Sequence, residues 1–282
     1  MEIKNLAQTP LPEIVACFNR AFSDYFVPIA ATEEAIEKRW RAGRVDYSLS
    51  FGAFDDGKLV AFIITGVDFL NGLKTAYNAG TGVIPEYRGQ RLVEKLYETA
   101  MPAFRAAGIR QSTLEVITQN EKAIKAYQKV GFQIVRTLHC LKGNLLTDLE
   151  NIAENGFAIT RTSEIDFNLL APLQPYEFSW DNRIEGVALI LPDLEGWLLH
   201  QNGNLKGYVL LNPASGYIAQ LGFSADNIPL YGKFLFREIA KQIPAVRINN
   251  VDSRAKEIYE LLKTISLENN IDQFEMLLKL PA

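Results

Sequence analysis

A strand, a turn and a helix that follow one another between residues 74 and 104 constrain the fold of this chain more than any other feature. A strand is predicted over roughly residues 74–83, and Pro85 should end it. The helical pattern that follows has an apolar face formed by Leu92, Leu96, Ala100 and Phe104. The turn between the two elements contains Gly89, so unpaired amides and the positive end of the helix dipole converge there. The segment therefore predicts an anion-binding site at the start of the helix.

The rest of the first half continues the alternation of helices and strands. Helices are predicted over residues 11–26 and from Thr32, whose hydroxyl can cap the helix, through Trp40. Apolar runs on either side of Asp55-Asp56-Gly57 predict a hairpin, because this tripeptide is a strong turn signal. The later elements are a strand over 112–117, a helix over 121–129 and a strand over 132–141. This order predicts a mixed α/β domain around one central sheet.

The length of 282 residues favours two domains, since typical domains contain roughly 100–200 residues. A polar, acidic stretch without strong periodicity lies near residues 146–156. We therefore predict a first domain over residues 1–146 and a smaller second domain over residues 156–282. The second domain is expected to contain strands near 157–161, 195–200, 205–212, 216–223 and 245–251, and helices over 233–242 and 253–263.

Composition argues against several classes of function. The net charge of −4 argues against a nucleic-acid partner, because phosphate binding normally demands a basic surface. No apolar run approaches the roughly 18 residues of a membrane span, and the start of the chain lacks the pattern of a secretory signal. We therefore expect a cytoplasmic protein without a membrane partner. Two distant cysteines, Cys17 and Cys140, and two solitary histidines, His139 and His200, predict neither a disulfide framework nor a metal site.

Two blocks of residues carry a family resemblance. The first is Val83-Ile84-Pro85-Glu86-Tyr87-Arg88-Gly89-Gln90, and the second consists of Asn120, Ala123, Ile124, Tyr127, Gly131 and Phe132. In this order they resemble the pyrophosphate loop and the second signature of the GCN5-related N-acetyltransferase (GNAT) family. The resemblance implies a GNAT fold in the first domain and acetyl-CoA as a co-substrate, with no metal.

The resemblance also implies which residues bind the co-substrate. They are Val83, Ile84, Arg88, Gly89, Gln90, Arg91, Leu92, Val93, Asn120 and Tyr127. An amide at Val83 would polarise the acetyl carbonyl, and arginines suit phosphate. The chain departs from the family pattern at Arg91 and Val93, where small residues are usual. From the residues alone, the turn could also be an ordinary one with solvated arginines, and Asn120 could simply cap a helix.

Two residues are candidates for acid–base catalysis. Tyr127 follows Asn120 by almost two helical turns and so shares its helix face, and family analogy makes it the acid for a departing thiolate. An ordinary core tyrosine is the alternative. Glu115 interrupts an apolar strand, and its spacing from Tyr127 is similar to that in ribosomal-protein N-terminal acetyltransferases, where the glutamate serves as a base through water. A structural carboxylate is the alternative there.

The acceptor site is less constrained than the donor site. By the resemblance, residues between the first two helices would line it, which indicates Ser23, Asp24, Tyr25 and Phe26. Residues 151–282 contain 11 basic and 16 acidic residues, and an acidic wall would attract a cationic amine. We therefore hypothesise that the second domain helps to form the acceptor site.

The second domain contains a faint repeat of the first. Asp252, Ala255 and Tyr259 reproduce the spacing of Asn120, Ala123 and Tyr127, which predicts a degenerate GNAT-like domain. Its loop at residues 222–227 lacks an Arg-Gly pair, and Asp226 would repel phosphate, so this domain should not bind CoA.

Three functions compete at this point. The leading one is an N-acetyltransferase that moves an acetyl group from acetyl-CoA to a primary amine of a small molecule or peptide. The alternatives are a GNAT-like module that binds an acyl-CoA or another ligand without turnover, and a purely structural α/β protein. The sequence leaves the acceptor and the oligomeric state open.

Overall fold

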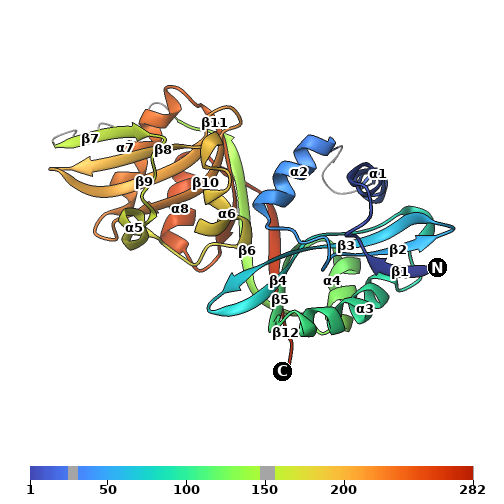
Figure 1. Ribbon diagram of the computed structural model, residues 1–282. Coiled ribbons are helices and arrows are strands. Elements are labelled where there is room, and N and C mark those ends of the chain that lie inside the picture. Colours follow the sequence, from blue (N-terminus) through green and yellow to red (C-terminus); the bar gives the residue numbers. More distant parts are fainter. Residues whose placement is uncertain (25–30, 147–155, 282) are drawn as a thin grey trace. The chain divides into compact units, whose positions relative to one another are not determined.

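The computed structural model describes residues 1–24, 31–146 and 156–281 and divides the chain into two units (Figure 1). Unit 1 comprises Met1–Val135 and Phe274–Ala282, and unit 2 comprises Arg136–Gln273. Both units consist of a mixed sheet with helices, so the predicted α/β class is confirmed. The division differs from the predicted one, because residues 136–146 belong to unit 2 and the chain returns to unit 1 from Phe274 onward. Most of the predicted boundary lies outside the described residues.

In unit 1 the strands lie in the order β1-β2-β3-β4-β5-β12-β6. The strands are β1 (Glu2–Asn5), β2 (Phe51–Asp55), β3 (Lys58–Leu70), β4 (Leu73–Val83), β5 (Gln111–Ile117), β6 (Gln133–Asn144) and β12 (Glu268–Lys279). The helices are α1 (Leu11–Ala21), α2 (Glu33–Ala42), α3 (Leu92–Ala106) and α4 (Glu121–Val130), with a 3-10 turn over Pro85–Tyr87. Figure 1 shows α1 and α2 on one face of this sheet and α3 and α4 on the other.

Local sequence signals explain several of these elements. The hairpin predicted at Asp55-Asp56-Gly57 joins β2 to β3, and Asp56 and Gly57 adopt φ angles of 47° and 77°. Both lie in the left-handed region that a two-residue hairpin turn requires. Thr32 caps α2 as predicted, since its hydroxyl accepts a hydrogen bond from the Ala35 amide at 3.2 Å.

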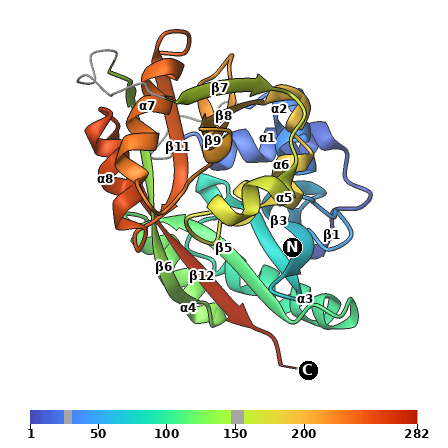
Figure 2. The same ribbon diagram turned by 90° about the vertical axis from the view of Figure 1, so that its left-hand side faces the viewer.

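The last strand of the chain completes unit 1. β12 lies between β5 and β6 (Figure 2). The Thr113 hydroxyl donates to the Met276 carbonyl at 3.0 Å, and the Leu280 amide donates to the Arg110 carbonyl at 2.8 Å. Met276 has no exposed side-chain surface. The sequence predicted neither this strand nor the short edge strand β1.

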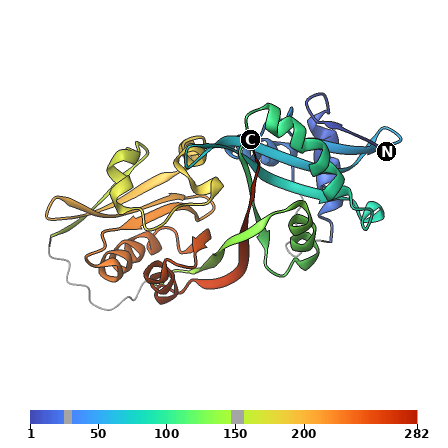
Figure 3. The same ribbon diagram turned by 90° about the horizontal axis from the view of Figure 1, so that it is seen from below.

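In unit 2 the strands lie in the order β12-β6-β11-β10-β9-β8-β7. The further strands are β7 (Phe157–Thr162), β8 (Glu195–Gln201), β9 (Asn204–Asn212), β10 (Tyr217–Phe223) and β11 (Ala245–Asp252). The helices are α5 (Phe167–Leu170), α6 (Ile184–Ala188), α7 (Ile228–Ala240) and α8 (Lys256–Thr264), with 3-10 turns over Ala171–Leu173, Trp180–Asn182 and Leu191–Asp193. Figure 3 shows α5 and α6, in yellow, and α7 and α8, in orange to red, on opposite faces of the sheet.

The strands of unit 2 follow the prediction closely, whereas its helices depart from it. α7 begins at Ile228 and α8 at Lys256, rather than at the predicted residues 233 and 253. The short helices α5 and α6 were not predicted. Among the described residues, no helix is both long and apolar enough to cross a membrane.

Each unit contains one pair of parallel strands whose pairing is short. In unit 1, Thr75–Tyr77 of β4 pair with Gln111–Thr113 of β5. In unit 2, Tyr217 and Ile218 of β10 pair with Arg247 and Ile248 of β11. Within the described residues, the two strands of each pair are not paired beyond these positions, which leaves a gap between them.

Candidate active site

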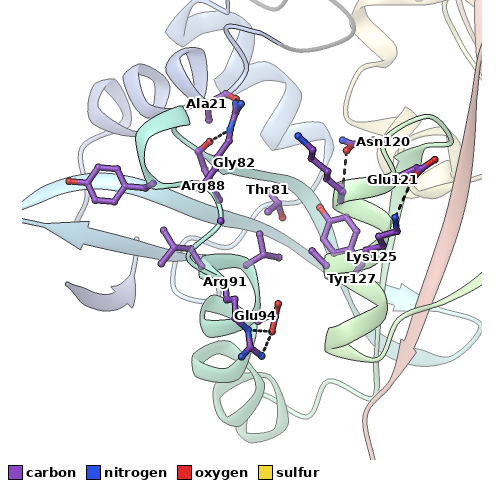
Figure 4. Close-up of a pocket in the computed structure, with 18 of the residues that line it drawn as sticks. Ala21, Thr81, Gly82, Arg88, Arg91, Glu94, Asn120, Glu121, Lys125 and Tyr127 are labelled. Atoms are coloured by element: carbon purple, nitrogen blue, oxygen red, sulfur yellow. Dashed lines mark hydrogen bonds and ion pairs between the residues drawn. The ribbon is translucent and has the colours of Figure 1, made fainter.

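A cavity of about 810 Å³ lies in unit 1, beside the part of β4 that has separated from β5 (Figure 4). This volume is in the range of sites for small ligands and cofactors. Its walls are the end of β4, the start of α3 and the start of α4. Of the predicted co-substrate residues, those that line it are Val83, Arg88, Gly89, Arg91, Leu92, Val93, Asn120 and Tyr127.

Ile84 and Gln90 were predicted in the same group, but neither lines the cavity. Ile84 is buried, and its amide donates to the Val60 carbonyl of β3 at 3.0 Å. Gln90 is exposed. The structure therefore brings eight of the ten predicted residues around one cavity and gives Ile84 a role in the sheet.

A bulge in β4 explains why the gap opens. The register between β3 and β4 shifts between Ile64 and Thr65, which face Gly80 and Asn78, so that Ala79 is the extra residue. A bulge bends its strand and increases the local twist. Because it follows directly after the last pair with β5, at Tyr77, the bulge accounts for the separation of the two strands.

The turn at residues 88–93 leads into the start of α3, which no side chain caps. Arg91 is the residue before the first turn of α3, and its side chain does not cap the helix. The first amides of a helix have no partner within the helix, so those of α3 remain available to an anion. Arg91 adopts φ 59° and ψ 30°, a left-handed conformation that favours glycine. The turn therefore keeps the backbone of the family pattern although the glycine is absent.

The guanidinium of Arg88 is bound to protein groups. It donates to both carboxylate oxygens of Asp24, at 2.6 and 2.7 Å, and to the carbonyls of Ala21 at 3.0 Å and Val83 at 3.2 Å. The hydrogen bond from Arg88 lowers the pKa of the Asp24 carboxyl, which keeps this pair ionised. Arg88 thus fixes the turn to the end of α1, a role that the sequence analysis did not foresee.

Arg91 is also paired. It donates to the Glu94 carboxylate from Nε at 2.7 Å and from Nη2 at 2.5 Å, and the Lys129 ammonium lies 3.7 Å from the same carboxylate. Figure 4 shows Arg91 and Glu94 side by side at the start of α3. Glu94 is buried, so two cations compensate one acidic group close to the available amides.

The cavity as a whole is basic. Five basic and three acidic side chains line it: Arg88, Arg91, Lys122, Lys125 and Lys129, and Asp24, Glu94 and Glu121. Lys125 is paired with Glu121 at 3.2 Å. Lys122 has no ion-pair partner within the part of the chain that the structure describes. This excess of positive charge suits an anionic ligand.

Asn120 and Tyr127 each make a structural contact and also line the cavity. Asn120 caps α4, since its side-chain oxygen accepts from the Ala123 amide at 3.2 Å, and it also lines the cavity. The Tyr127 ring packs edge to face against Tyr97 and Phe132, with ring centroids 6.4 and 5.8 Å apart. In Figure 4 this ring extends from α4 toward Thr81 of β4, so Tyr127 lies at the edge of the core and on the cavity wall.

Asn78 is a residue of the site that sequence reasoning missed. Its amide nitrogen lies 2.7 Å from the Thr81 hydroxyl, 2.9 Å from the Tyr97 hydroxyl and 3.5 Å from the Tyr127 hydroxyl. Burial, with a smaller contribution from Tyr127, raises the pKa of Tyr97 well above its usual value, so Tyr97 stays protonated. The available signal was an amide side chain where the apolar strand approaches the predicted turn.

Glu115 alternates with its neighbours as predicted but does not line the cavity. Leu114 and Val116 are buried, whereas Glu115 is only half-buried. The Tyr77 hydroxyl of β4 donates a short hydrogen bond to the Glu115 carboxylate. Since Tyr77 and Asn78 are successive strand residues, their partners Glu115 and Tyr127 are reached from opposite faces of the sheet.

The predicted acceptor segment is described only in part. Asp24 lines the cavity and pairs with Arg88, whereas Ser23 donates to the Arg20 carbonyl at 2.9 Å and does not line it. Tyr25 and Phe26 lie outside the described residues. Within the described ranges, no group of three or more His, Cys, Asp or Glu side chains is placed to hold a metal ion.

Comparison with known proteins gives this geometry a family. Residues 14–132 match the model of the Acetyltransferase (GNAT) family. The match to the GNAT family thus lies within unit 1. N-alpha-acetyltransferase 30 of Schizosaccharomyces pombe is 30% identical to this chain over 84 residues, which are 29% of this chain and 56% of that protein. The chain therefore matches little more than half of the length of this curated relative.

Solved structures share the fold of this chain over its whole length. A GCN5-related N-acetyltransferase from Sphaerobacter thermophilus has a TM-score of 0.70 at 12% identity and covers 100% of this chain and 96% of its own. A tandem GNAT protein from the clavulanic acid biosynthesis pathway has a TM-score of 0.67 at 11% identity and covers 100% and 99%. These likenesses confirm the predicted tandem arrangement of two GNAT-like units.

Proposed function

We propose that unit 1 transfers an acetyl group from acetyl-CoA to a primary amine of a small molecule or peptide. The observation that carries this proposal is one cavity that joins the available amides of α3 to the Tyr127 ring beside the strand gap. The amides and the excess of basic side chains suit the pyrophosphate of CoA. The gap beside β4 suits an extended arm that ends in a thioester.

The backbone of β4 offers a donor for the thioester carbonyl. The Ile84 amide points to β3, where it binds Val60. Because hydrogen-bonding directions alternate along an antiparallel strand, the Val83 amide points to the other edge of β4, toward the gap. A donor fixed there before the reaction stabilises negative charge as it develops on the carbonyl oxygen.

Acetyl-CoA supplies an activated acyl group. The chain supplies a base for the proton of the attacking amine and an acid for the departing sulfur. The amine nitrogen forms a bond to the carbonyl carbon, and the carbon–sulfur bond breaks. Glu115 accepts the proton that leaves the nitrogen, directly or through water, and Tyr127 gives its proton to the departing sulfur. Glu115 later releases its proton to solvent and Tyr127 takes one up, so the net products from a neutral amine are the acetylated amine and the free thiol of CoA.

The proposal is tested by incubating the chain with acetyl-CoA and a panel of amines, including peptides with free N-termini. We expect thiol release that depends on one class of amine, together with a product that is heavier by one acetyl group in mass spectrometry. Tyr127→Phe should lower kcat by about 10²–10⁴-fold with acetyl-CoA affinity preserved, because only the proton of the leaving group is lost. Full activity of Tyr127→Phe would leave Tyr127 with a packing role alone.

A module that binds acyl-CoA without turnover is the second candidate. The buried Glu94 carboxylate favours it, because an acidic group close to the start of α3 opposes the binding of phosphate. A rise in melting temperature with acetyl-CoA, but no thiol release with any amine, would support this candidate over the enzyme.

A further inference from the structure

We infer that Tyr77 and Asn78, two adjacent residues of β4, position the base and the acid of the proposed reaction, one on each face of the sheet. The inference rests on the proposed function. It starts from the place of this dipeptide, because Tyr77 is the last residue of β4 that pairs with β5 and the bulge at Ala79 follows Asn78. The two side chains therefore lie where the pairing of β4 with β5 ends and the gap between these strands begins.

Tyr77 holds Glu115. Its ring is buried, with 6% of its surface exposed, and its hydroxyl donates to Glu115 Oε2. The strand partner of Tyr77 is Thr113, so Glu115 lies two residues further along β5, on the part that has separated. A donor on a fixed ring sets the rotamer of the glutamate and the plane of its carboxylate. The base is thus oriented at the edge of the gap rather than left to solvent.

The Asn78 amide nitrogen lies 3.5 Å from the Tyr127 hydroxyl oxygen, and its two hydrogens are shared between this oxygen and the nearer oxygens of Thr81 and Tyr97. The orientation of this amide is fixed by chemistry, because the Gly80 amide can only donate and lies 3.0 Å from Asn78 Oδ1. Nδ2 must then face the hydroxyls of Thr81, Tyr97 and Tyr127. A donor beside the Tyr127 oxygen turns the phenolic proton away from Asn78. It also stabilises the phenolate that forms when Tyr127 gives up its proton.

Neither residue takes part in bond making. Both keep their own protons while the amine proton passes to Glu115 and the Tyr127 proton passes to sulfur. Tyr77 and Asn78 are therefore positioning residues, and each acts through a different partner. That separation gives the experiment its controls, because a general loss of structure would affect both partners alike.

The test uses Tyr77→Phe and Asn78→Asp in the full chain, each alone and combined with Glu115→Gln or Tyr127→Phe. Asn78→Asp keeps the shape and the acceptor for Gly80 but replaces the donating amide by an oxygen. Each single variant should lower kcat by about tenfold or more, with the KM for acetyl-CoA changed by less than about threefold. Tyr77→Phe should add no further loss to Glu115→Gln yet act in full on Tyr127→Phe, and Asn78→Asp should show the reverse pattern.

Losses of kcat that are additive in all four double variants would overturn the inference. Coupling of Tyr77 and Asn78 to the same partner, either Glu115 or Tyr127, would also overturn it. Melting temperatures and acetyl-CoA affinities of the single variants show whether each one is folded. If Asn78→Asp is not, Asn78→Ser replaces it and is held to the same coupling pattern.

The failure of the proposed function gives a different result. A natural chain that transfers no acetyl group removes both the function and this inference. Turnover that survives Glu115→Gln and Tyr127→Phe removes the assigned acid and base, and with them the positioning roles. If turnover depends on Glu115 and Tyr127 but the losses in the four double variants are additive, the acid and the base stand and only the positioning roles of Tyr77 and Asn78 are removed.

Discussion

The two units contain the same gap between parallel strands, and only the gap in unit 1 adjoins the cavity. In unit 2 the chain itself bridges the separated strands with the segment around Trp180–Asn182. The Asn182 amide donates to the Ala219 carbonyl of β10 at 2.8 Å, and Gln220 donates to the Asn182 carbonyl at 2.7 Å. On the other strand, Asn250 donates to the Ser179 hydroxyl at 2.9 Å. All four polar side chains are buried, and their hydrogen bonds connect the bridging segment to β10 and to β11.

The helix that follows each gap shows the same contrast. The start of α3 is not capped by a side chain, whereas Asn227 caps α7 by accepting from the Leu230 amide at 3.2 Å. Pro229 removes one further donor. Asp226 precedes the cap, and the hydrogen bond from Lys206 lowers its pKa well below the usual range, so it stays ionised. Unit 2 therefore repeats the strand arrangement of unit 1, but its gap is bridged by the chain and the start of its helix is capped.

The largest effect is expected from ending the chain at Glu150. Unit 1 would then lose β12, including the buried Met276 and the hydrogen bonds to Arg110 and Thr113. We expect no cooperative thermal transition and no acetyl-CoA binding, measured by circular dichroism and calorimetry. Residues 1–135 joined by a flexible linker to residues 268–281 should recover both. A chain ending at Glu150 that binds acetyl-CoA normally would show that unit 1 does not need its last strand.

The second expectation concerns the segment that bridges the gap of unit 2. Asn182→Ala removes a side chain that bonds Tyr217, Ala219 and Ser179, and leaves buried polar groups without that partner. We expect a loss of about 3 kcal/mol in the unfolding free energy of unit 2, by urea denaturation. Acetyl-CoA affinity should not change, because the cavity lies in unit 1. The exposed Asn204→Ala is the control and should cost less than about 0.5 kcal/mol.

The Asn182→Ala variant also shows whether unit 2 gains the ability to bind acetyl-CoA once its bridging segment is weakened, and such binding would make the two units more alike than we propose. It would mean that the bridging segment alone keeps the second gap closed. A stoichiometry of one acetyl-CoA per chain in both proteins is the expected result, because the cap at Asn227 and the charge of Asp226 remain.

A smaller effect is expected at the turn of unit 1, and the chain contains a matched control. Gly89 and Gly203 both have φ 79°, and a Cβ added at either one meets nothing within 4 Å. Valine at either position strains the backbone to a similar extent, but only Gly89 lies in the turn that presents amides to the cavity. Gly89→Val should weaken acetyl-CoA binding by about 1–3 kcal/mol in calorimetry, whereas Gly203→Val should not. Equal affinities of both variants would contradict an anion site at this turn.

What the sequence predicted well depends on neighbouring residues. The turn at Asp55-Asp56-Gly57, the cap at Thr32 and the strand, turn and helix over residues 74–104 are local, and the structure has each of them. β12 was missed because its partner β5 lies more than 150 residues earlier, and no local pattern specifies such a pairing. The pairing also moved the domain division away from the acidic stretch.

The sequence predicted most of the residues that line the cavity on the family motif, but it did not predict the hydrogen-bond partners of these residues. Eight of the predicted residues line it because a family motif fixes positions along the backbone. The partners of Arg88 and Arg91 could not be derived, because Asp24 approaches only when α1 packs near the turn, and Glu94 has to share a helix face with Arg91. Asn78 was missed for the same reason, since its importance comes from hydroxyls on α3 and α4.

The smallest expected effect tests the repeat between the two units. The sequence set Asp252, Ala255 and Tyr259 against Asn120, Ala123 and Tyr127, but the residues that cap α4 and α8 give a different equivalence. Asn120 has φ −84° and ψ 64°, and Ala255 has φ −81° and ψ 62°. With these two residues superposed, Tyr127 corresponds to Leu262, which has no exposed surface.

Tyr259 therefore lies outside the position of the acid, three residues before Leu262 on α8. Its ring packs against His139, with the ring centroids 4.6 Å apart, and the Lys263 ammonium lies 5.6 Å from its centre. Tyr259→Phe keeps both contacts and should leave kcat within about twofold and the unfolding free energy within about 0.5 kcal/mol. Tyr127→Phe in the same assay supplies the contrasting loss of rate. A comparable loss in Tyr259→Phe would mean that unit 2 takes part in the chemistry, because neither packing contact needs the hydroxyl, and the contrast between an open and a filled gap would no longer separate the two units by function.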